Sequence, residues 1–297
     1  MAATLTAKHR VPRRPAPRRP TPRRPARNPW AFAWYAMVVV FVLWAVLPIL
    51  IVAVNSFKTT LDIFSSTPHL LFKPTLVNYR NVFSEIDYTR LLANSSLVAL
   101  GTMLLSLCVG VPAAYALARL AMRAREWWAL GILFTRMVPA VVLVVPMYVI
   151  FVKTHLIGSY WAMIFADTTF NLPLVVWLMR SFFSEVPNEL ESAAQVDGCG
   201  RVGVFMRVAI PLTLPGLIAT AILCLLFSWN EFLFALTLSG PSTQTVPVGV
   251  ASFVGTVSVD WGGSSAAAVI AMVPIFVLGL CAQRFLVRGL TMGAVKG

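Results

Sequence analysis

Long uninterrupted apolar runs are the feature that most constrains the fold of this chain. A helix needs roughly 20 apolar residues to cross a bilayer, and six runs of about that length occur, at residues 30–54, 92–117, 127–152, 160–182, 212–238 and 264–286. Backbone groups inside hydrocarbon must bond to one another, so the runs are expected to be helices. A membrane barrel would instead show alternating strands of about ten residues. The sequence therefore predicts an all-α membrane protein with six transmembrane helices.

The positively charged residues favour one orientation of these helices. With the N-terminus inside the cell, the inner segments hold 18 of the lysine and arginine residues and the outer segments hold five. Leaving out the first 29 residues changes the comparison to nine against five, with the same sign. Because cytoplasmic loops carry the excess of Lys and Arg, the N- and C-termini are both predicted to be cytosolic.

Residues 1–29 form a basic segment, rich in arginine and proline, before the first apolar run. Such a composition cannot bury apolar surface, so a disordered or extended tail is predicted. Basic arms can bind nucleic acid, but a position directly before a span favours a cytosolic topology signal that touches anionic lipid. The apolar run that follows is too long for a secretory signal. No nucleic-acid partner is therefore expected.

Residue types that carry catalysis or bind metals do not cluster in the sequence. The four cysteines and three histidines are scattered, without the paired spacing of a disulfide framework or a zinc site. The phosphate-binding pattern Gly-x-x-x-x-Gly-Lys-Ser/Thr is also missing. We therefore expect no catalytic residues, no metal ligands and no cofactor bound by this chain. A membrane enzyme, which would need acids, bases or ligands at a shared depth, is the least favoured class.

A polar segment at residues 187–211 separates the fourth and fifth apolar runs. Pro187 suits the first turn of a helix, and the two glutamates that follow would lie near its positive N-terminal end. Asp197-Gly198 is a typical helix stop, and a second short helix is predicted at about residues 201–208. These residues alone leave two interpretations open, an amphipathic surface helix without a partner or a docking element for a soluble protein.

The spacing of small and acidic residues in this segment is similar to a known motif. Ala193-Ala194-x-x-Asp197-Gly198, followed by Ile210-Pro211-Leu212 and Pro215, resembles the EAA loop of ABC-transporter permeases. In that family the loop is a coupling helix that sits in a cleft of the cytosolic ATPase. The resemblance implies an ATPase-coupling role for one set of residues in the segment: Glu191, Ser192, Ala193, Ala194, Asp197, Gly198 and Pro211.

One position departs from the motif. Ser192 aligns with the leading glutamate of the family, and Glu191 is the residue before it. A shift of one residue turns a side chain by about 100° around a helix. Whether Glu191 compensates for Ser192 is left open by the sequence.

Other segments resemble the smaller permease subunit of maltose-type carbohydrate importers, namely residues 55–58, 227–238 and 289–297. The resemblance covers about residues 30–297 and implies the helix bundle of a type I ABC importer permease. It also implies partners: a second homologous permease subunit, two copies of a cytosolic ABC ATPase that bind ATP and Mg, and an extracytoplasmic sugar-binding protein. The implied location is the bacterial plasma membrane, with several passes through the lipid bilayer.

The expected organisation has four parts. Residues 1–29 form the basic cytosolic tail, and residues 30–91 form the first transmembrane helix and an external loop. Residues 92–286 form the permease core of five transmembrane helices, which includes the 187–211 segment. Residues 287–297 form a cytosolic C-terminal tail.

Polar residues near or within the apolar runs mark a candidate substrate path. Asn171, Asn230 and Glu231 belong to this group, and charges at membrane depth usually face a bundle interior or a wet path. Their amides and carboxylate can bond sugar hydroxyls; alternatively, they lie at the outer interface or bond other helices. Arg136 is predicted to have a structural role, because it can snorkel or pair with an acidic group.

The sequence thus predicts a permease subunit of an ATP-driven carbohydrate importer, which forms half of the translocation path. The alternative is an ABC permease for a non-sugar solute such as glycerol phosphate or a polyol. A self-sufficient secondary carrier is disfavoured because no inverted repeat is visible. The identity of the sugar does not follow from the sequence.

Overall fold

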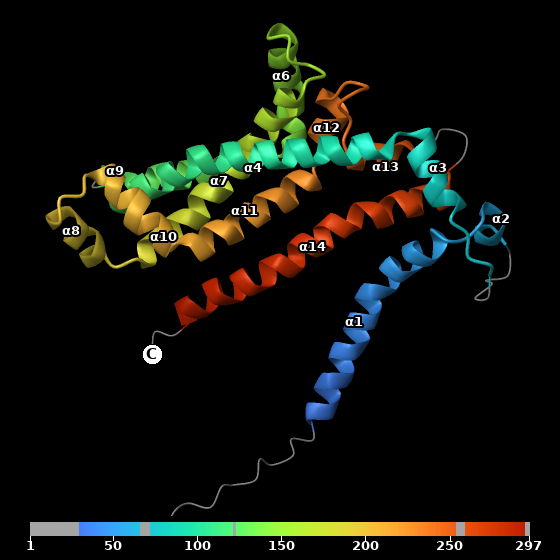
Figure 1. Ribbon diagram of the computed structural model, residues 1–297, viewed down its shortest axis with the longest axis horizontal. Coiled ribbons are helices and arrows are strands. Elements are labelled where there is room, and N and C mark those ends of the chain that lie inside the picture. The colour runs from blue at the N-terminus through green and yellow to red at the C-terminus, as the bar shows by residue number, and fades with distance from the viewer. Residues whose placement is uncertain (1–29, 66–71, 121–122, 254–258, 295–297) are drawn as a thin grey trace, which may run out of the picture. The chain divides into compact units, whose positions relative to one another are not determined.

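The computed structural model describes residues 30–65, 72–120, 123–253 and 259–294. The predicted basic tail, residues 1–29, lies outside these ranges. Within them the regular structure is helical (Figure 1), and an isolated β-bridge joins Gly158 to Ser239. Contacts divide the chain into two units, residues 1–48 and 49–297, which are described separately.

Helix α1 (Trp30–Asn55) begins in the first unit and is apolar on every side. Its side chains from Phe32 to Ile51 are all exposed within the chain, as expected for a helix surrounded by lipid. Two short helices, α2 (Thr60–Ile63) and α3 (Val77–Glu85), follow in the segment that the sequence predicts to be an external loop.

Four long helices form the framework of the second unit: α4 (Tyr88–Arg119), α7 (Tyr160–Glu185), α11 (Leu214–Trp229) and α14 (Trp261–Ala294). Helices α4 and α7 lie side by side (Figure 1). At Gly110 an added Cβ would lie 2.6 Å from Cγ1 of Val175, so the missing side chain is what permits this close contact. Small residues let membrane helices approach closely where dispersion contacts must hold them together.

The N-terminal half of α4 is bonded to later parts of the chain. Oη of Tyr88 donates to the carbonyl of Ala267 at 2.6 Å, which joins α4 to α14. Nδ2 of Asn94 donates to the carbonyls of Ser242 at 3.1 Å and Gln244 at 2.8 Å. These two carbonyls precede α13 (Val246–Ser252), a helix inside the predicted second external loop.

The span expected over residues 127–152 is divided into two helices in the structure. The chain forms α5 (Arg125–Thr135) and α6 (Ala140–Lys153), with a bend of 86° between them. Pro139 cannot donate a backbone hydrogen bond, and it disfavours helical geometry at the residue before it. Arg136, the C-cap of α5, therefore lies at the corner.

The helix expected over residues 212–238 is interrupted as well. Helix α11 ends at Trp229, and α12 (Leu233–Leu238) begins after a short break. The carboxylate of Glu231 accepts hydrogen bonds from the backbone N–H of Phe234 and Ala235, each at 3.0 Å. It thereby satisfies amide groups that a helix start leaves without an intrahelical partner.

The number of membrane-crossing helices agrees with the predicted class. Among the described residues, four helices are long and apolar enough to cross a membrane, and the count reaches six if each of two bent pairs is one span. The all-α prediction is confirmed. The structure differs from six straight helices because two of the counted spans are bent pairs. Helix α14 also continues through Ala294, so the segment predicted as a C-terminal tail is helical up to that residue.

Candidate functional site

The 187–211 segment folds into four short helical pieces: α8 (Asn188–Val196), α9 (Arg201–Val204), the π-helical turn η1 (Phe205–Ala209) and α10 (Ile210–Leu212). The helix stop predicted at Asp197-Gly198 is confirmed, because Asp197 is the C-cap of α8 and Gly198 has a φ of +87°. The second predicted helix corresponds to α9 together with η1. Pro211 cannot donate to the carbonyl of Arg207, as a regular α-helix would require.

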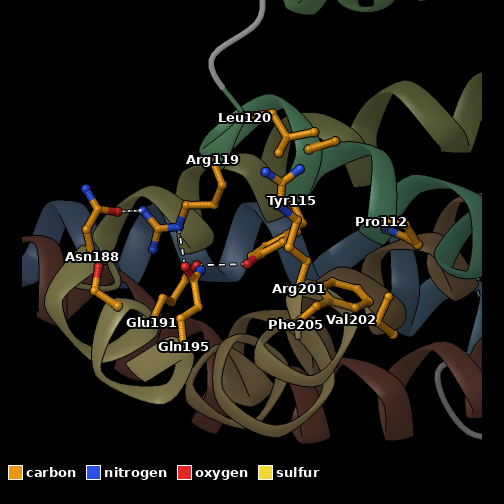
Figure 2. Close-up of a pocket in the computed structure, with 12 residues that line it drawn as sticks. Pro112, Tyr115, Arg119, Leu120, Asn188, Glu191, Gln195, Arg201, Val202 and Phe205 are labelled. Carbon is orange, nitrogen blue, oxygen red and sulfur yellow. Dashed lines mark hydrogen bonds and ion pairs between the residues drawn. The ribbon is translucent and has the colours of Figure 1, made fainter. Parts of the chain in front are cut away.

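Glu191 points inward and fixes α8 to the end of α4 (Figure 2). Its Oε1 lies 2.8 Å from Nε of Arg119, and its Oε2 accepts a 2.8 Å hydrogen bond from Oη of Tyr115. The other guanidinium nitrogens of Arg119 donate to Oδ1 of Asn188 at 2.6 Å and to the carbonyl of Val186 at 2.7 Å. Both side chains of the ion pair are buried, with 12% and 8% exposed. The pair is therefore a fully bonded anchor rather than a loose surface contact.

Aromatic packing adds a second attachment beside this ion pair. The ring of Tyr115 lies 5.3 Å from that of Phe183 on α7 and 4.9 Å from that of Phe205 on η1, measured between centroids. Burial of such rings, with their edges against neighbouring faces, stabilises the contact between elements. Helices α4 and α7 and the turn η1 are thus joined at one point.

Much of the rest of the segment is open to solvent. Ser192, Ala193, Asp197 and Gly198 are exposed, and Ala194 is half-buried. Several apolar side chains are also exposed on this polar segment: Leu190, Val196, Val202 and Met206. Exposed apolar groups that gather on a polar segment are typical of a protein-docking surface.

Glu191 and Ser192 therefore face different directions. The carboxylate of Glu191 is bonded to Arg119 and Tyr115, whereas Ser192 is exposed at the edge of the groove beside α4. A one-residue step of about 100° around the helix accounts for the difference. In this structure the Glu191 carboxylate does not stand in the place where the motif has its glutamate.

A groove of about 560 Å³ lies between the C-terminal end of α4 and the segment (Figure 2). Tyr115 and Arg119 line one wall, and Glu191, Gln195 and Arg201 line the other. The contacts of Arg119 and Tyr115 with Glu191 are not predicted from the sequence. The only available signal is an arginine placed at the end of an apolar run.

The candidate path residues are only partly brought together. Asn171 and Glu231 line one cavity of about 210 Å³, beside Asp167 and Arg136. Asn230 does not line this cavity. Its side chain is exposed, and its Nδ2 donates to the carbonyl of Leu226 at 2.7 Å.

Comparison with known proteins gives one family match that covers most of the chain. The family described as "Binding-protein-dependent transport system inner membrane component" matches residues 106–292. The chain is 34% identical to the probable ABC transporter permease protein y4oR of Sinorhizobium fredii, over 90% of this chain and 95% of that protein.

Two further relatives have names that mention a substrate. The sulfoquinovosyl glycerol transport system permease protein SmoH of Agrobacterium fabrum is 39% identical, over 75% of this chain and 79% of that protein. The trehalose/maltose transport system permease protein MalG of Thermococcus litoralis is 34% identical, over 79% of this chain and 86% of that protein.

A similar fold occurs in a crystal structure of a bacterial ABC transporter involved in the import of the acidic polysaccharide alginate. The TM-score is 0.74 with 20% sequence identity, over 86% of this chain and 95% of that chain.

Proposed function

This chain belongs to the family of binding-protein-dependent transport system inner membrane components, the permease subunits of ABC transporters, and we propose that the solute it imports is a carbohydrate. It is a transport subunit, not an enzyme, and ATP hydrolysis is assigned to a separate partner chain that binds ATP and Mg. The sugars in the names of the relatives support a carbohydrate substrate.

The charge of the membrane cavity argues against the alternative of glycerol phosphate, which carries close to two negative charges at pH 7. A phosphate needs a surplus of cationic or N–H donor groups. The 210 Å³ cavity holds one cation, Arg136, against two carboxylates, Asp167 and Glu231. A polyol is distinguished from a sugar by the uptake panel described below.

The proposed complex contains this chain, a second homologous permease, two cytosolic ATPases and an extracytoplasmic sugar-binding protein. The family description names dependence on a binding protein. The bias of Lys and Arg between the loops supports cytosolic termini and a 187–211 segment on the ATPase side of the membrane.

The coupling assignment depends on one observation: α8 is bonded to α4 through some side chains and exposes others to solvent. Its inner side is bonded to α4 through Glu191 and Arg119, while Ser192, Ala193 and Gly198 remain open. Movement of a docked ATPase would therefore pass through α8 into α4. Asp197 belongs to the same open side, and Pro211 ends the segment where it turns into α11.

The test is uptake by cells from which the chromosomal copy of this chain has been deleted and in which a plasmid copy restores it. Radiolabelled trehalose, maltose and sulfoquinovosyl glycerol are supplied, with glycerol phosphate and sorbitol as non-sugar comparisons. We expect uptake of at least one sugar, which depends on the plasmid copy. Uptake of glycerol phosphate or sorbitol alone would refute the carbohydrate assignment.

The coupling assignment has its own test, Gly198→Asp in the restored strain. We expect loss of uptake together with loss of the ATPase from the purified complex. Normal uptake with normal ATPase retention would refute the docking role of the open side.

A further inference from the structure

The cavity of about 210 Å³ is formed where two interrupted helices meet α7. Arg136 comes from the corner between α5 and α6, Phe227 lies near the end of α11, and Glu231 lies in the break between α11 and α12. Asp167 and Asn171 lie on α7 and are 2% and 5% exposed. Asp167 is seven residues into a helix that is a candidate span, about 10 Å from its start at a rise of 1.5 Å per residue.

Two of these charged groups have unused bonding capacity. Oδ2 of Asp167 accepts a hydrogen bond from Oγ of Ser228, but Oδ1 has no hydrogen-bond partner among the described residues, although it is buried. Arg136 makes no hydrogen bond or ion pair through its guanidinium with any residue in the described part of the chain; its Cζ lies 4.9 Å from the centroid of the Phe227 ring. Buried polar groups in folded proteins nearly always have partners, so Asp167 is marked for a ligand, and the half-buried Arg136 can bond the same one.

Glu231, by contrast, is already occupied. Both of its oxygens accept hydrogen bonds from the backbone at the start of α12. Asn171 donates to the carbonyl of Asp167 at 3.1 Å, which leaves its amide oxygen as an acceptor. The cavity therefore combines free N–H donors on Arg136 with free acceptors on Asp167 and Asn171.

This combination selects a class of ligand. An anion would satisfy Arg136 but be repelled by Asp167, and a cation would satisfy Asp167 but be repelled by Arg136. A hydroxyl group both donates and accepts, so adjacent hydroxyls can bond to both side chains at once. The exposed ring of Phe227 adds a face on which the apolar side of a sugar ring can pack.

We propose that this cavity is a binding subsite for one ring of the imported carbohydrate, with Asp167 and Arg136 as the side chains that bond its hydroxyls. Pockets for drug-sized ligands occupy roughly 300–1,000 Å³, so 210 Å³ fits a single ring rather than a whole oligosaccharide. The proposal rests on the carbohydrate function above and adds a contact site within this subunit.

The test measures binding in the purified complete importer, independently of uptake. Ala140, which lines the cavity, is replaced by Ala140→Cys in a chain whose four native cysteines have been changed to alanine. The rate at which a maleimide labels the introduced thiol is measured with and without the transported sugar, which the uptake panel identifies among trehalose, maltose and sulfoquinovosyl glycerol. Ser184→Cys, at an exposed position on α7 remote from the cavity in sequence, is the control.

We expect the transported sugar to slow labelling of Ala140→Cys severalfold and to leave labelling of Ser184→Cys unchanged. Asp167→Asn should raise the sugar concentration needed for protection by about tenfold or more, as expected for loss of one charge-assisted hydrogen bond. Arg136→Gln should have the same effect, and it replaces Asp167→Asn in the test if that variant fails to assemble. The guanidinium of Arg136 forms no hydrogen bond or ion pair with the described residues and lies over the Phe227 ring, so its removal should disturb folding little.

The outcomes separate this proposal from the function on which it rests. A sugar that is imported by the complex but does not protect Ala140→Cys overturns the subsite and leaves the carbohydrate function standing. Equal protection in the parent chain, Asp167→Asn and Arg136→Gln overturns the roles of the two side chains. If the complete importer takes up no sugar of the panel, the carbohydrate function fails and the subsite fails with it.

Discussion

Nε of Arg119 lies 2.8 Å from Oε1 of Glu191, and this contact joins the last residue of α4 to the middle of α8. All three guanidinium nitrogens are used, two of them on side chains of α8 and the third on the carbonyl of Val186 before it. A lysine could not reproduce this planar arrangement of donors. The pair therefore determines where the 187–211 segment stands relative to α4.

Removal of Glu191 is predicted to leave a buried charge without its partner. Glu191→Ala should lower the stability of the purified complex by about 3–5 kcal/mol, the range for one half of a buried ion pair. Thermal unfolding of the complex in detergent is the measurement. Glu189→Ala, on the same helix but exposed, should change little. If Glu191→Ala, Arg119→Ala and the double variant show additive effects, the two side chains are not coupled.

Gly198 offers a test of backbone geometry, because its φ of +87° is unfavourable for any residue with a side chain. Gly198→Ala should destabilise the turn by about 1–2 kcal/mol and weaken retention of the ATPase during purification. Gly200→Ala is the matched control, since Gly200 has a φ of −69°. No atom lies within 4 Å of an added Cβ at either position, so crowding is excluded as the cause. Equal behaviour of the two variants would contradict the argument.

Ser192 and Glu191 are predicted to respond in opposite ways to substitution. Ser192→Glu restores the glutamate of the motif on the open side and should leave folding intact, with ATPase retention equal to or greater than that of the parent chain. Glu191→Ser should disrupt the anchor, and adding Ser192→Glu should not repair it. Co-purification of the ATPase at low salt measures both effects. Repair by the exchanged pair would show that the two positions are interchangeable.

The break before α12 depends on Glu231 as the acceptor for two backbone amides. Glu231→Ala should cost about 0.5–2 kcal/mol, the range for loss of a capping side chain. Asn230→Ala removes a side chain that bonds only within α11 among the described residues and should cost less. Thermal unfolding distinguishes the two, and a larger effect at Asn230 would refute the capping role.

Local patterns in the sequence predict much of this fold correctly. Apolar runs locate the long helices, since burial in lipid imposes a minimum length, and Asp197-Gly198 locates the end of α8, since glycine tolerates positive φ. Both signals act over a few residues. A proline such as Pro139 predicts a kink but not its size, and the break near Glu231 is missed because hydropathy does not register a capping carboxylate.

The side-chain relationships within the site could not be read in the same way. Arg119 and Glu191 are 72 residues apart, and Asp167 and Ser228 are 61 apart. Their proximity results from the packing of α4, α7 and α11, which no local pattern encodes. The motif names Glu191 as part of the coupling region, but only the helix geometry shows that its carboxylate faces inward.

Helix α4 connects the two ends of the molecule's second unit. At one end Arg119 bonds α8, and towards the other end Asn94 bonds the chain before α13. Its 32 residues extend about 48 Å at 1.5 Å per residue. A tilt of a few degrees imposed at the Arg119 end would be amplified into a displacement of several ångström near Tyr88. In the proposed complex the helix would act as a lever, with a short stroke at its Arg119 end and a longer one near Tyr88.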